Sequence, residues 1–130
     1  MLHLTRQPHK TCNTVGPVPP NSVVPAAALD LDHEPVPEDQ RVAGSPTTAV
    51  RTLTELHGVE VGVWGMSVGG MRDIEADEVF VVLSGSAQVE FADGSPALDL
   101  NRGDVVRLAA GSHTVWTVTE TLRKVYLAAG

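Results

Sequence analysis

A run of five apolar residues, 79–83, lies between Asp77-Glu78 and the turn signal Ser84-Gly85. Its length and its β-branched and aromatic composition predict a strand. Because side chains alternate along a strand, Phe80 and Val82 share one face with Glu78, and the opposite face is apolar as well. A strand that is apolar on both faces is covered on both sides. We therefore expect Glu78 at the mouth of a core strand, pointing toward the interior.

Similar short segments alternate with turn signals from residue 47 onward. The segment 86–91 alternates strictly between polar and apolar residues, as in a strand with one wet face. Asp93-Gly94 is a strong hairpin signal, and Gly69-Gly70 is expected to break the chain between strands. No segment shows helical periodicity with caps. The pattern predicts an all-β antiparallel sandwich or barrel. The strands expected besides 79–83 are 59–66, 86–91, 98–100, 105–108, 112–118 and 122–128.

The first 46 residues have a different texture, because they contain prolines at 8, 17, 19, 20, 25, 35, 37 and 46. Proline removes a backbone donor and restricts the residue before it, so regular structure is scarce in such a stretch. We expect a flexible proline-rich tail over 1–25, an extended N-terminal arm over 26–46 and a β-barrel domain over 47–130. The arm is expected along a sheet edge or over the outer face of the sheet.

Composition narrows the class of protein. Hydrophobic residues make up 42% of the chain, enough for one core, while nine basic against sixteen acidic residues give a net charge of −7. No basic cluster interrupts this balance, which argues against a nucleic-acid or membrane partner. Cys12 is the only cysteine. With no disulfide within the chain, no hydrophobic leader and no apolar run of transmembrane length, we expect a cytoplasmic protein.

Two motifs follow each other along the barrel domain. Glu78 is followed by six residues and Gly85, and Gly103-Asp104-Val105 opens a second motif that ends at Gly111. This order resembles the two conserved motifs of the cupin superfamily, which are small jelly-roll barrels. The residues of the two motifs are most similar to those of the one-domain group that includes (S)-ureidoglycine aminohydrolase and ethanolamine-utilisation proteins. The resemblance covers roughly residues 44–128. It is carried by residues 62–64, 77–79, 83–85, 103–105, 116–118 and 123–126.

The resemblance implies metal ligands at His-x-His before the Glu and at one His after the second motif. In this chain the first pair falls on Arg72 and Ile74, or on Met71 and Asp73 if the spacer is one residue longer. Of these four residues, only Asp73 is an oxygen ligand. A divalent ion needs several nitrogen or oxygen ligands that converge on one point. The implied set is therefore depleted.

The last implied ligand falls on Thr114, and the neighbouring His113 has the opposite strand parity. Glu78 alone matches the implied ligand set. We expect no tightly bound metal. Manganese, iron, nickel or zinc remains a disfavoured cofactor, with Asp73, Glu78 and His113 as weak candidate ligands.

A carboxylate inside a barrel is costly unless it meets a cation or hydrogen-bond donors. Arg72 occupies a ligand position in the shorter alignment, so we hypothesise that Arg72 pairs with Glu78 in the barrel mouth. The alternative is that Arg72 is a solvated loop charge.

Further binding candidates follow from parity. Thr114 and Trp116 share one face of their strand, and Lys124 and Tyr126 share a face of the closing strand that the resemblance places inward. Trp64, Trp116 and Tyr126 form a candidate aromatic wall, and Lys124 a candidate partner for a carboxylate. The alternatives are plain core filling for the tryptophans and a surface position for Lys124.

Three functions are consistent with these residues. The first is a cupin that binds a small polar or carboxylated metabolite in the barrel. The second is a metal-dependent hydrolase or isomerase similar to (S)-ureidoglycine aminohydrolase, in which Glu78 would be the catalytic residue. The third is a structural or interaction protein. The resemblance implies the second, but the depleted ligand set favours the first, and a fold alone does not fix a function.

The outer face of the 79–83 strand, with Val79, Val81 and Leu83, predicts a covering partner. Either the arm or a second subunit should shield it, and the resemblance implies a homodimer. A monomer by light scattering, with stability unchanged on deleting the arm, would contradict both.

Overall fold

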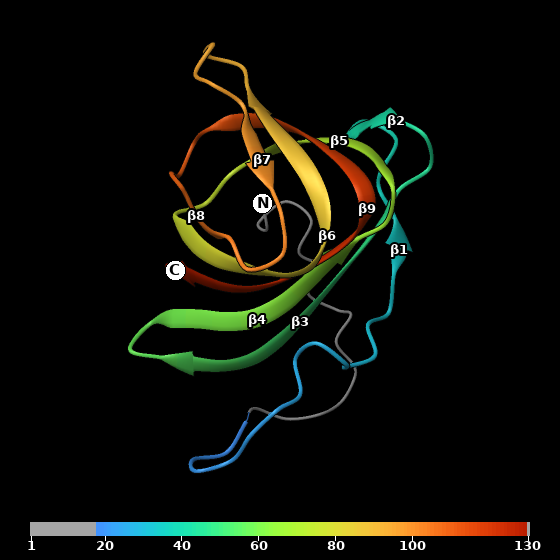
Figure 1. The fold of residues 1–130 in the computed structure, drawn as a ribbon. Coiled ribbons are helices and arrows are strands. Elements are labelled where there is room, and N and C mark those ends of the chain that lie inside the picture. The colour runs from blue at the N-terminus through green and yellow to red at the C-terminus, as the bar shows by residue number, and fades with distance from the viewer. Residues whose placement is uncertain (1–17, 130) are drawn as a thin grey trace.

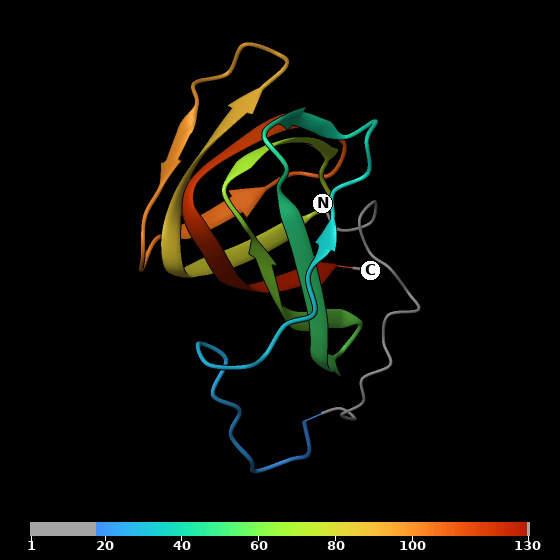
Figure 2. The same ribbon diagram turned by 90° about the vertical axis from the view of Figure 1, so that its right-hand side faces the viewer.

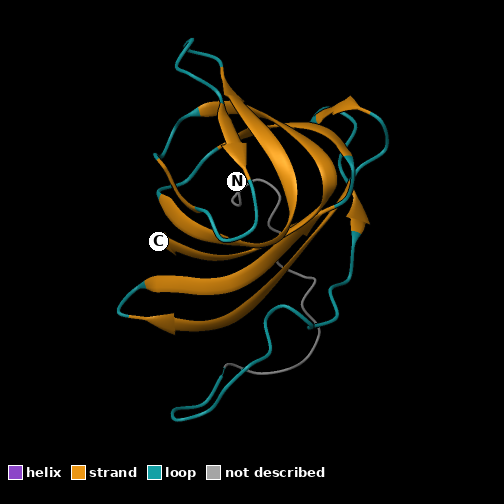
Figure 3. Ribbon diagram, in the orientation of Figure 1, coloured by secondary structure: helices purple, strands orange, loops and turns teal. Residues whose placement is uncertain are grey.

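The computed structural model describes residues 18–129, and none of them lies in a helix. Figure 3 shows strands and loops only. Within that part of the chain, no helix is long and apolar enough to cross a membrane. The strands are β1 (Glu34–Pro35), β2 (Arg41–Ala43), β3 (Thr47–Leu56), β4 (Val59–Met66), β5 (Gly69–Ile74), β6 (Glu78–Phe91), β7 (Leu98–Leu100), β8 (Val105–Leu108) and β9 (His113–Ala129).

The strands form one antiparallel sheet that curls round the interior, as seen end-on in Figure 1. The order β1-β3-β4-β9-β5-β2 runs through the sheet, and β6 joins β9 to β7 and β8. Inward positions hold the core, with Trp64, Phe80 and Trp116 as its largest apolar side chains together with Tyr126. The prediction of an all-β jelly-roll barrel is confirmed.

Two strands are longer than predicted. β6 runs without a break through Gly85, and β9 runs through Thr119-Glu120-Thr121, where we expected a strand end and a turn. The two bends face each other, because the β6–β9 register shifts between Val82 and Ala87. Gly85 has φ of 88°, and a Cβ there would overlap the carbonyl of Thr121. These turn-like residues therefore bend the strands at a barrel corner and do not end them.

β9 is the strand on which the barrel closes. Its first half pairs with β5 and with the second half of β6. Its second half pairs with β4 and with the first half of β6. One strand thus lines both halves of the interior, and it contributes Thr114, Trp116, Lys124 and Tyr126 to the inside.

The arm adds short strands at two sheet edges. β1 pairs with β3 through Glu34 and Thr48, and β2 pairs with β5 through Arg41 and Met71. Figure 2 shows the cyan β1 beside the longer green β3. Of the two arrangements expected for the arm, the edge position is the one found for these strands. The domain boundaries stay a prediction, and residues 1–17 of the expected tail lie outside the described part.

The outer face of β6 is only partly covered. Val79 is 36% exposed, Leu127 beside it on β9 is 41% exposed, and Val105 on β8 is 70% exposed. The arm strands β1 and β2 pair with β3 and β5, not with β6. The expected second subunit stays a prediction.

Gly62 on β4 leaves space on the barrel wall for the side chain of Tyr126. Gly62 lies opposite Tyr126 on β9, and a Cβ at Gly62 would overlap the Tyr126 hydroxyl and lie 2.7 Å from the carbonyl oxygen of Arg51. In this space the Tyr126 hydroxyl donates a 2.6 Å hydrogen bond to Glu60 Oε2. The buried tyrosine thereby keeps its polar end satisfied.

Gly62→Ala should lower the free energy of unfolding by about 1–3 kcal/mol, because the added methyl group overpacks the wall against Tyr126. Chemical denaturation measures the change. Gly65→Ala on the same strand is the matched control, since its Cβ would lie 3.2 Å from the tip of the Leu31 side chain and 3.3 Å from the carbonyl oxygen of Leu122, which are looser contacts than those at Gly62. Equal losses of unfolding free energy in the two variants would show that the overlap with Tyr126 is not the cause.

Candidate functional site

The alternation along β5 decides between the two alignments left open by the sequence. Met71 and Asp73 are buried, whereas Arg72 and Ile74 are exposed. The longer spacer therefore describes this chain. The inward series continues past the end of β5 to Glu75, which is also buried.

The centre of the interior is an ion pair between β6 and β9. Lys124 Nζ donates to Glu78 Oε2 at 2.8 Å, and both side chains are 0% exposed. The ammonium also lies over three aromatic rings, at 3.9 Å from the Phe80 centroid, 4.6 Å from Trp64 and 4.7 Å from Trp116. These distances are those of cation–π contacts, which favour a charged lysine in a desolvated site. We call these five residues the lysine cage.

Burial and charge act in opposite directions on the pair. Burial raises the pKa of Glu78 and lowers the pKa of Lys124, since both charged forms lose water. The attraction between the two groups opposes both shifts, and the carboxylates of Glu75 and Asp73 further oppose the shift of Lys124. The charges are thus held inside by each other and by the rings, at a considerable desolvation cost.

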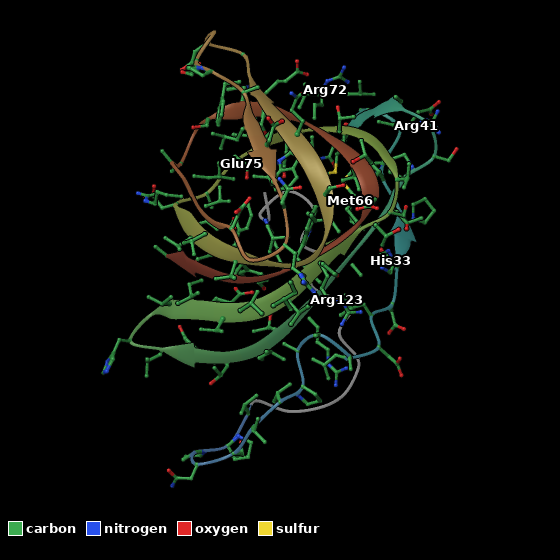
Figure 4. The ribbon with its side chains drawn as sticks, viewed as in Figure 1. His33, Arg41, Met66, Arg72, Glu75 and Arg123 are labelled. Carbon is green, nitrogen blue, oxygen red and sulfur yellow. The ribbon has the colours of Figure 1, made fainter. Side chains whose placement is uncertain are left out.

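Glu75 forms a second polar centre beside the lysine cage. Its Oε2 accepts hydrogen bonds from Thr114 Oγ1 at 2.6 Å and from Trp116 Nε1 at 2.9 Å. Burial raises the pKa of Glu75, but the pKa lies below its ordinary value. Among the described residues, the charge of Lys124 and these two hydrogen bonds lower it. Figure 4 shows Glu75 within the barrel, while Arg72 lies outside it.

Asp73 is the third inward carboxylate. Its Oδ1 accepts a 2.8 Å hydrogen bond from the Ile74 backbone N–H. Burial is the main reason why the pKa of Asp73 is raised from 3.8 to about 7, and repulsion by Glu75 adds to the effect. Asp73 therefore changes its protonation near neutral pH, inside a cluster that already holds two carboxylates and one ammonium.

Only one of the two carboxylate oxygens of Glu78 takes part in the ion pair. Glu78 Oε1 is buried and accepts no hydrogen bond from the described residues, although Oε2 is paired with Lys124. Buried acceptors are nearly always hydrogen-bonded in proteins, so such an oxygen is a candidate contact for a ligand.

The hypothesis that Arg72 pairs with Glu78 is wrong. Arg72 is exposed on the outer face of β5, where its Nη1 donates to the backbone carbonyl of Asp39 at 3.2 Å. Lys124 takes the role of cation instead. The physical reason is the strand period of two, which turns Arg72 outward when Met71 and Asp73 face inward.

The remaining predicted site residues divide between the interior and the outer wall. Trp64, Thr114, Trp116 and Lys124 come together in the interior as expected. Tyr126 is buried too, but its hydroxyl turns to Glu60 and away from the lysine cage. His113 is exposed on the outer face of β9, so it does not join Asp73 and Glu78.

The sequence reasoning missed Glu75 and Phe80 as parts of the site. Phe80 was placed inward by parity, but its position below the Lys124 ammonium depends on how β6 and β9 pair. Glu75 shares the parity of Met71 and Asp73, and that signal was available. The sequence pattern predicts no strand between Gly70 and Asp77, so it does not place Glu75 on an inward face.

The donor set does not fit a bound divalent metal. The implied ligand positions hold the thioether of Met71, the hydroxyl of Thr114 and the carboxylates of Asp73 and Glu78, and an ammonium lies 2.8 Å from Glu78. A cation beside the main carboxylate competes directly with a metal ion. In the described part of the chain, no group of three or more His, Cys, Asp or Glu side chains is arranged to hold one.

Comparison with known proteins agrees with this fold. The EutQ-like cupin domain family matches residues 53–126, which is more than half of the chain. The chain belongs to the EutQ-like cupin family. No curated protein matches this EutQ-like cupin at a significant level.

Solved structures similar to this EutQ-like cupin share its fold at low sequence identity. A protein of unknown function from Pseudomonas syringae pv. tomato has a TM-score of 0.63 and 24% identity, covering 79% of this chain and 46% of its own. The Clostridium difficile EutQ protein has a TM-score of 0.58 and 18% identity, and the match covers 72% of this chain and 79% of the EutQ protein. A cupin superfamily protein from Desulfitobacterium hafniense has a TM-score of 0.59 and 14% identity, and the match covers 90% of this chain and 98% of the Desulfitobacterium protein. This chain therefore spans less than half of the Pseudomonas protein.

Removing one partner of the ion pair should destabilise the barrel strongly. Lys124→Met leaves Glu78 as an unpaired buried charge, and we expect the free energy of unfolding to fall by about 3–5 kcal/mol. The double variant Lys124→Met/Glu78→Gln removes both charges and should recover a large part of this loss. Denaturant unfolding of the three proteins measures both effects. A double variant as unstable as Lys124→Met would mean that packing, not the unpaired charge, dominates.

Asp73 should make stability depend on pH. Its folded pKa of about 7 exceeds the ordinary value of 3.8, so between these values the folded state binds the proton that the unfolded state has lost. The free energy of unfolding should therefore fall as pH rises from 4 to 7, by up to roughly 1.4 kcal/mol per pH unit.

Asp73→Asn should weaken this dependence, because only Glu78, whose pKa is also raised, still contributes in the same direction, whereas Asp32→Asn on the exposed arm should keep it in full. Thermal unfolding across this pH range compares the three proteins. Parallel curves for wild type and Asp73→Asn would refute a raised pKa at this residue.

Proposed function

We propose that this EutQ-like cupin binds a small polar metabolite in the barrel interior, against Glu78 and Lys124. The observation that carries the proposal is the buried Glu78 Oε1, which accepts no hydrogen bond from the described residues beside a Lys124 donor. An acceptor next to a donor is the complement of a molecule that carries both groups, such as an amide, a ureide or a carboxylate with an attached amine.

The energetic cost of the lysine cage supports a functional role. A buried ion pair is weak support for stability, because well-packed apolar residues of the same volume are often equally stable. Perturbed titratable groups gather at functional sites more often than elsewhere. This interior holds Lys124, Glu78, Glu75 and Asp73, all with shifted pKa values.

The close packing limits the size of the ligand. Lys124, Trp64 and Trp116 are at most 1% exposed, and Glu78 is 3% exposed. A ligand that reaches Glu78 Oε1 must therefore be small, with only a few non-hydrogen atoms, or must displace one of the surrounding side chains. The homodimer and the cytoplasmic location expected from the sequence remain part of this proposal.

A metal-dependent hydrolase similar to (S)-ureidoglycine aminohydrolase is the less favoured alternative. That reaction class relies on a bound ion to polarise the substrate or to activate water. The Lys124 ammonium next to Glu78 disfavours such an ion here. No observation in the structure favours the alternative over ligand binding.

The proposal is tested with four small probes that differ in which groups they present. Acetamide and urea carry donors and an acceptor, acetate carries acceptors only, and ethanolamine, chosen because two of the solved neighbours are ethanolamine-utilisation or EutQ proteins, carries an amine and a hydroxyl. Titration of isotope-labelled protein, followed by NMR, measures binding. We expect acetamide or urea to shift signals of Glu78, Lys124 and Trp116, and acetate to bind more weakly.

The matched control is the Lys124→Met/Glu78→Gln variant, which should lose these shifts while it remains folded. Added Zn²⁺ or Mn²⁺ should change neither the shifts nor the melting temperature. Absence of binding by all four probes, or equal binding to the variant, would overturn the proposal. Metal-dependent binding would favour the hydrolase alternative.

A further inference from the structure

A pocket of 560 Å³ lies on the wall of the barrel, where β5, β9 and β6 run side by side next to the turn before β2. Its lining includes Arg72, Ile74, Glu90 and Val115, and neither Glu78 nor Lys124 belongs to it. It is therefore a different site from the lysine cage. Its residues Arg72, Glu90 and Val115 lie on the outer face of the sheet, although Asp73 and Thr114, whose side chains are buried, also border it.

Strand register places two opposite charges on the two sides of this pocket. Arg72 on β5 and Glu90 on β6 both lie opposite Val115 on β9. The three residues thus form a row across the outer face, with the charges two strand spacings apart. Two spacings correspond to about 10 Å between the Cα atoms. The side chains leave room for a molecule between them.

Both charged groups have hydrogen-bonding capacity to offer. The Arg72 side chain donates one hydrogen bond, from Nη1 to the backbone carbonyl of Asp39 at 3.2 Å. The Arg72 backbone N–H donates to the Gln40 carbonyl, and Gln40 Nε2 donates to the Arg72 carbonyl. These contacts hold Arg72 against the turn and leave its other guanidinium N–H groups available. Within the described residues, the Glu90 carboxylate takes part in no hydrogen bond or ion pair, and none joins it to Arg72.

The floor between the charges is apolar. Val115 lies between Arg72 and Glu90, and Ile74 and His113 form the next row of the same face. Ile74 is 41% exposed, which is high for a large apolar residue in a strand. An aliphatic group placed on Ile74 and Val115 would remove this apolar surface from water.

We propose that this pocket binds an aliphatic zwitterion, with the carboxylate on Arg72, the ammonium group on Glu90 and the aliphatic chain on Ile74 and Val115. Arginine pairs well with carboxylates through parallel N–H groups, and a carboxylate accepts readily from an ammonium group. An α-amino acid with a branched side chain has this set of groups. The site is separate from the proposed barrel function and does not depend on it.

The test is an NMR titration of isotope-labelled protein with L-leucine. Two analogues each lack one charge: 4-methylpentanoate has no ammonium group, and 3-methylbutylamine has no carboxylate. We expect L-leucine to shift the backbone signals of Arg72, Glu90 and Val115, and to bind roughly tenfold more tightly than either analogue, since each charged contact contributes on the order of a factor of ten.

Arg72→Gln and Glu90→Gln should each weaken L-leucine binding by roughly tenfold. Both residues are exposed, so the variants should fold. The matched controls are Arg102→Gln and Glu55→Gln, which remove exposed charges outside the pocket and should leave binding unchanged.

The proposal is overturned if L-leucine shifts no signal around this pocket, or if 4-methylpentanoate or 3-methylbutylamine binds as tightly as L-leucine. Unchanged binding in both pocket variants would overturn it as well. The Lys124→Met/Glu78→Gln variant separates the two sites, because it should lose the interior site and keep L-leucine binding.

Discussion

One charged group inside the barrel determines how its walls are arranged. The Lys124 ammonium on β9 contacts a carboxylate and a ring from β6, a ring from β4 and a ring from β9 itself. Because a buried charge without partners costs several kcal/mol, these strands must keep their register for the pair to survive. A slip of one residue in β9 would turn Lys124 outward and leave Glu78 alone in an apolar interior. The ion pair therefore specifies the closed arrangement more than it stabilises it.

The interior also separates three carboxylates by their environment. Glu78 pairs with the ammonium, and Glu75 accepts hydrogen bonds from Thr114 and Trp116. Among the described residues, Asp73 is affected mainly by burial and by the like charge of Glu75. Groups of one chemical type thus differ in pKa through position alone. This difference is what gives the interior its binding potential, since the groups offer acceptors of unequal basicity within one small space.

Much of the fold and of the interior site could be predicted from the sequence, because side chains along a strand alternate with a period of two. Once the 79–83 segment is recognised, Glu78 has to share its face with Phe80, and the same rule groups Trp116 with Thr114 and Lys124 with Tyr126. The inward direction of the Lys124 face was implied by the resemblance, and the structure places Lys124 inside. The identity of the partner of Glu78 could not be predicted in this way. It depends on how β6 pairs with β9, and the one residue of spacer after β5 decides only whether Arg72 or Asp73 faces inward. The continuity of the strands through Gly85 and Thr121 could not be predicted either. Turn-forming residues bend a strand at a corner, without ending it, when the neighbouring strand continues the ladder on both sides of the bend.

The position of β9 has a consequence for the time course of folding. β4, β5 and β6 all pair with a strand that follows them by some tens of residues, as in the pair of Val59 and Ala129. Local hairpins such as β3–β4 can form early, but the barrel wall has an open seam until β9 enters it. Contacts of such long sequence separation make folding slow, because much chain entropy is lost before they form. During that interval the edges of β4 and β5 are unpaired, and chaperone binding or association between chains would compete with closure at this seam.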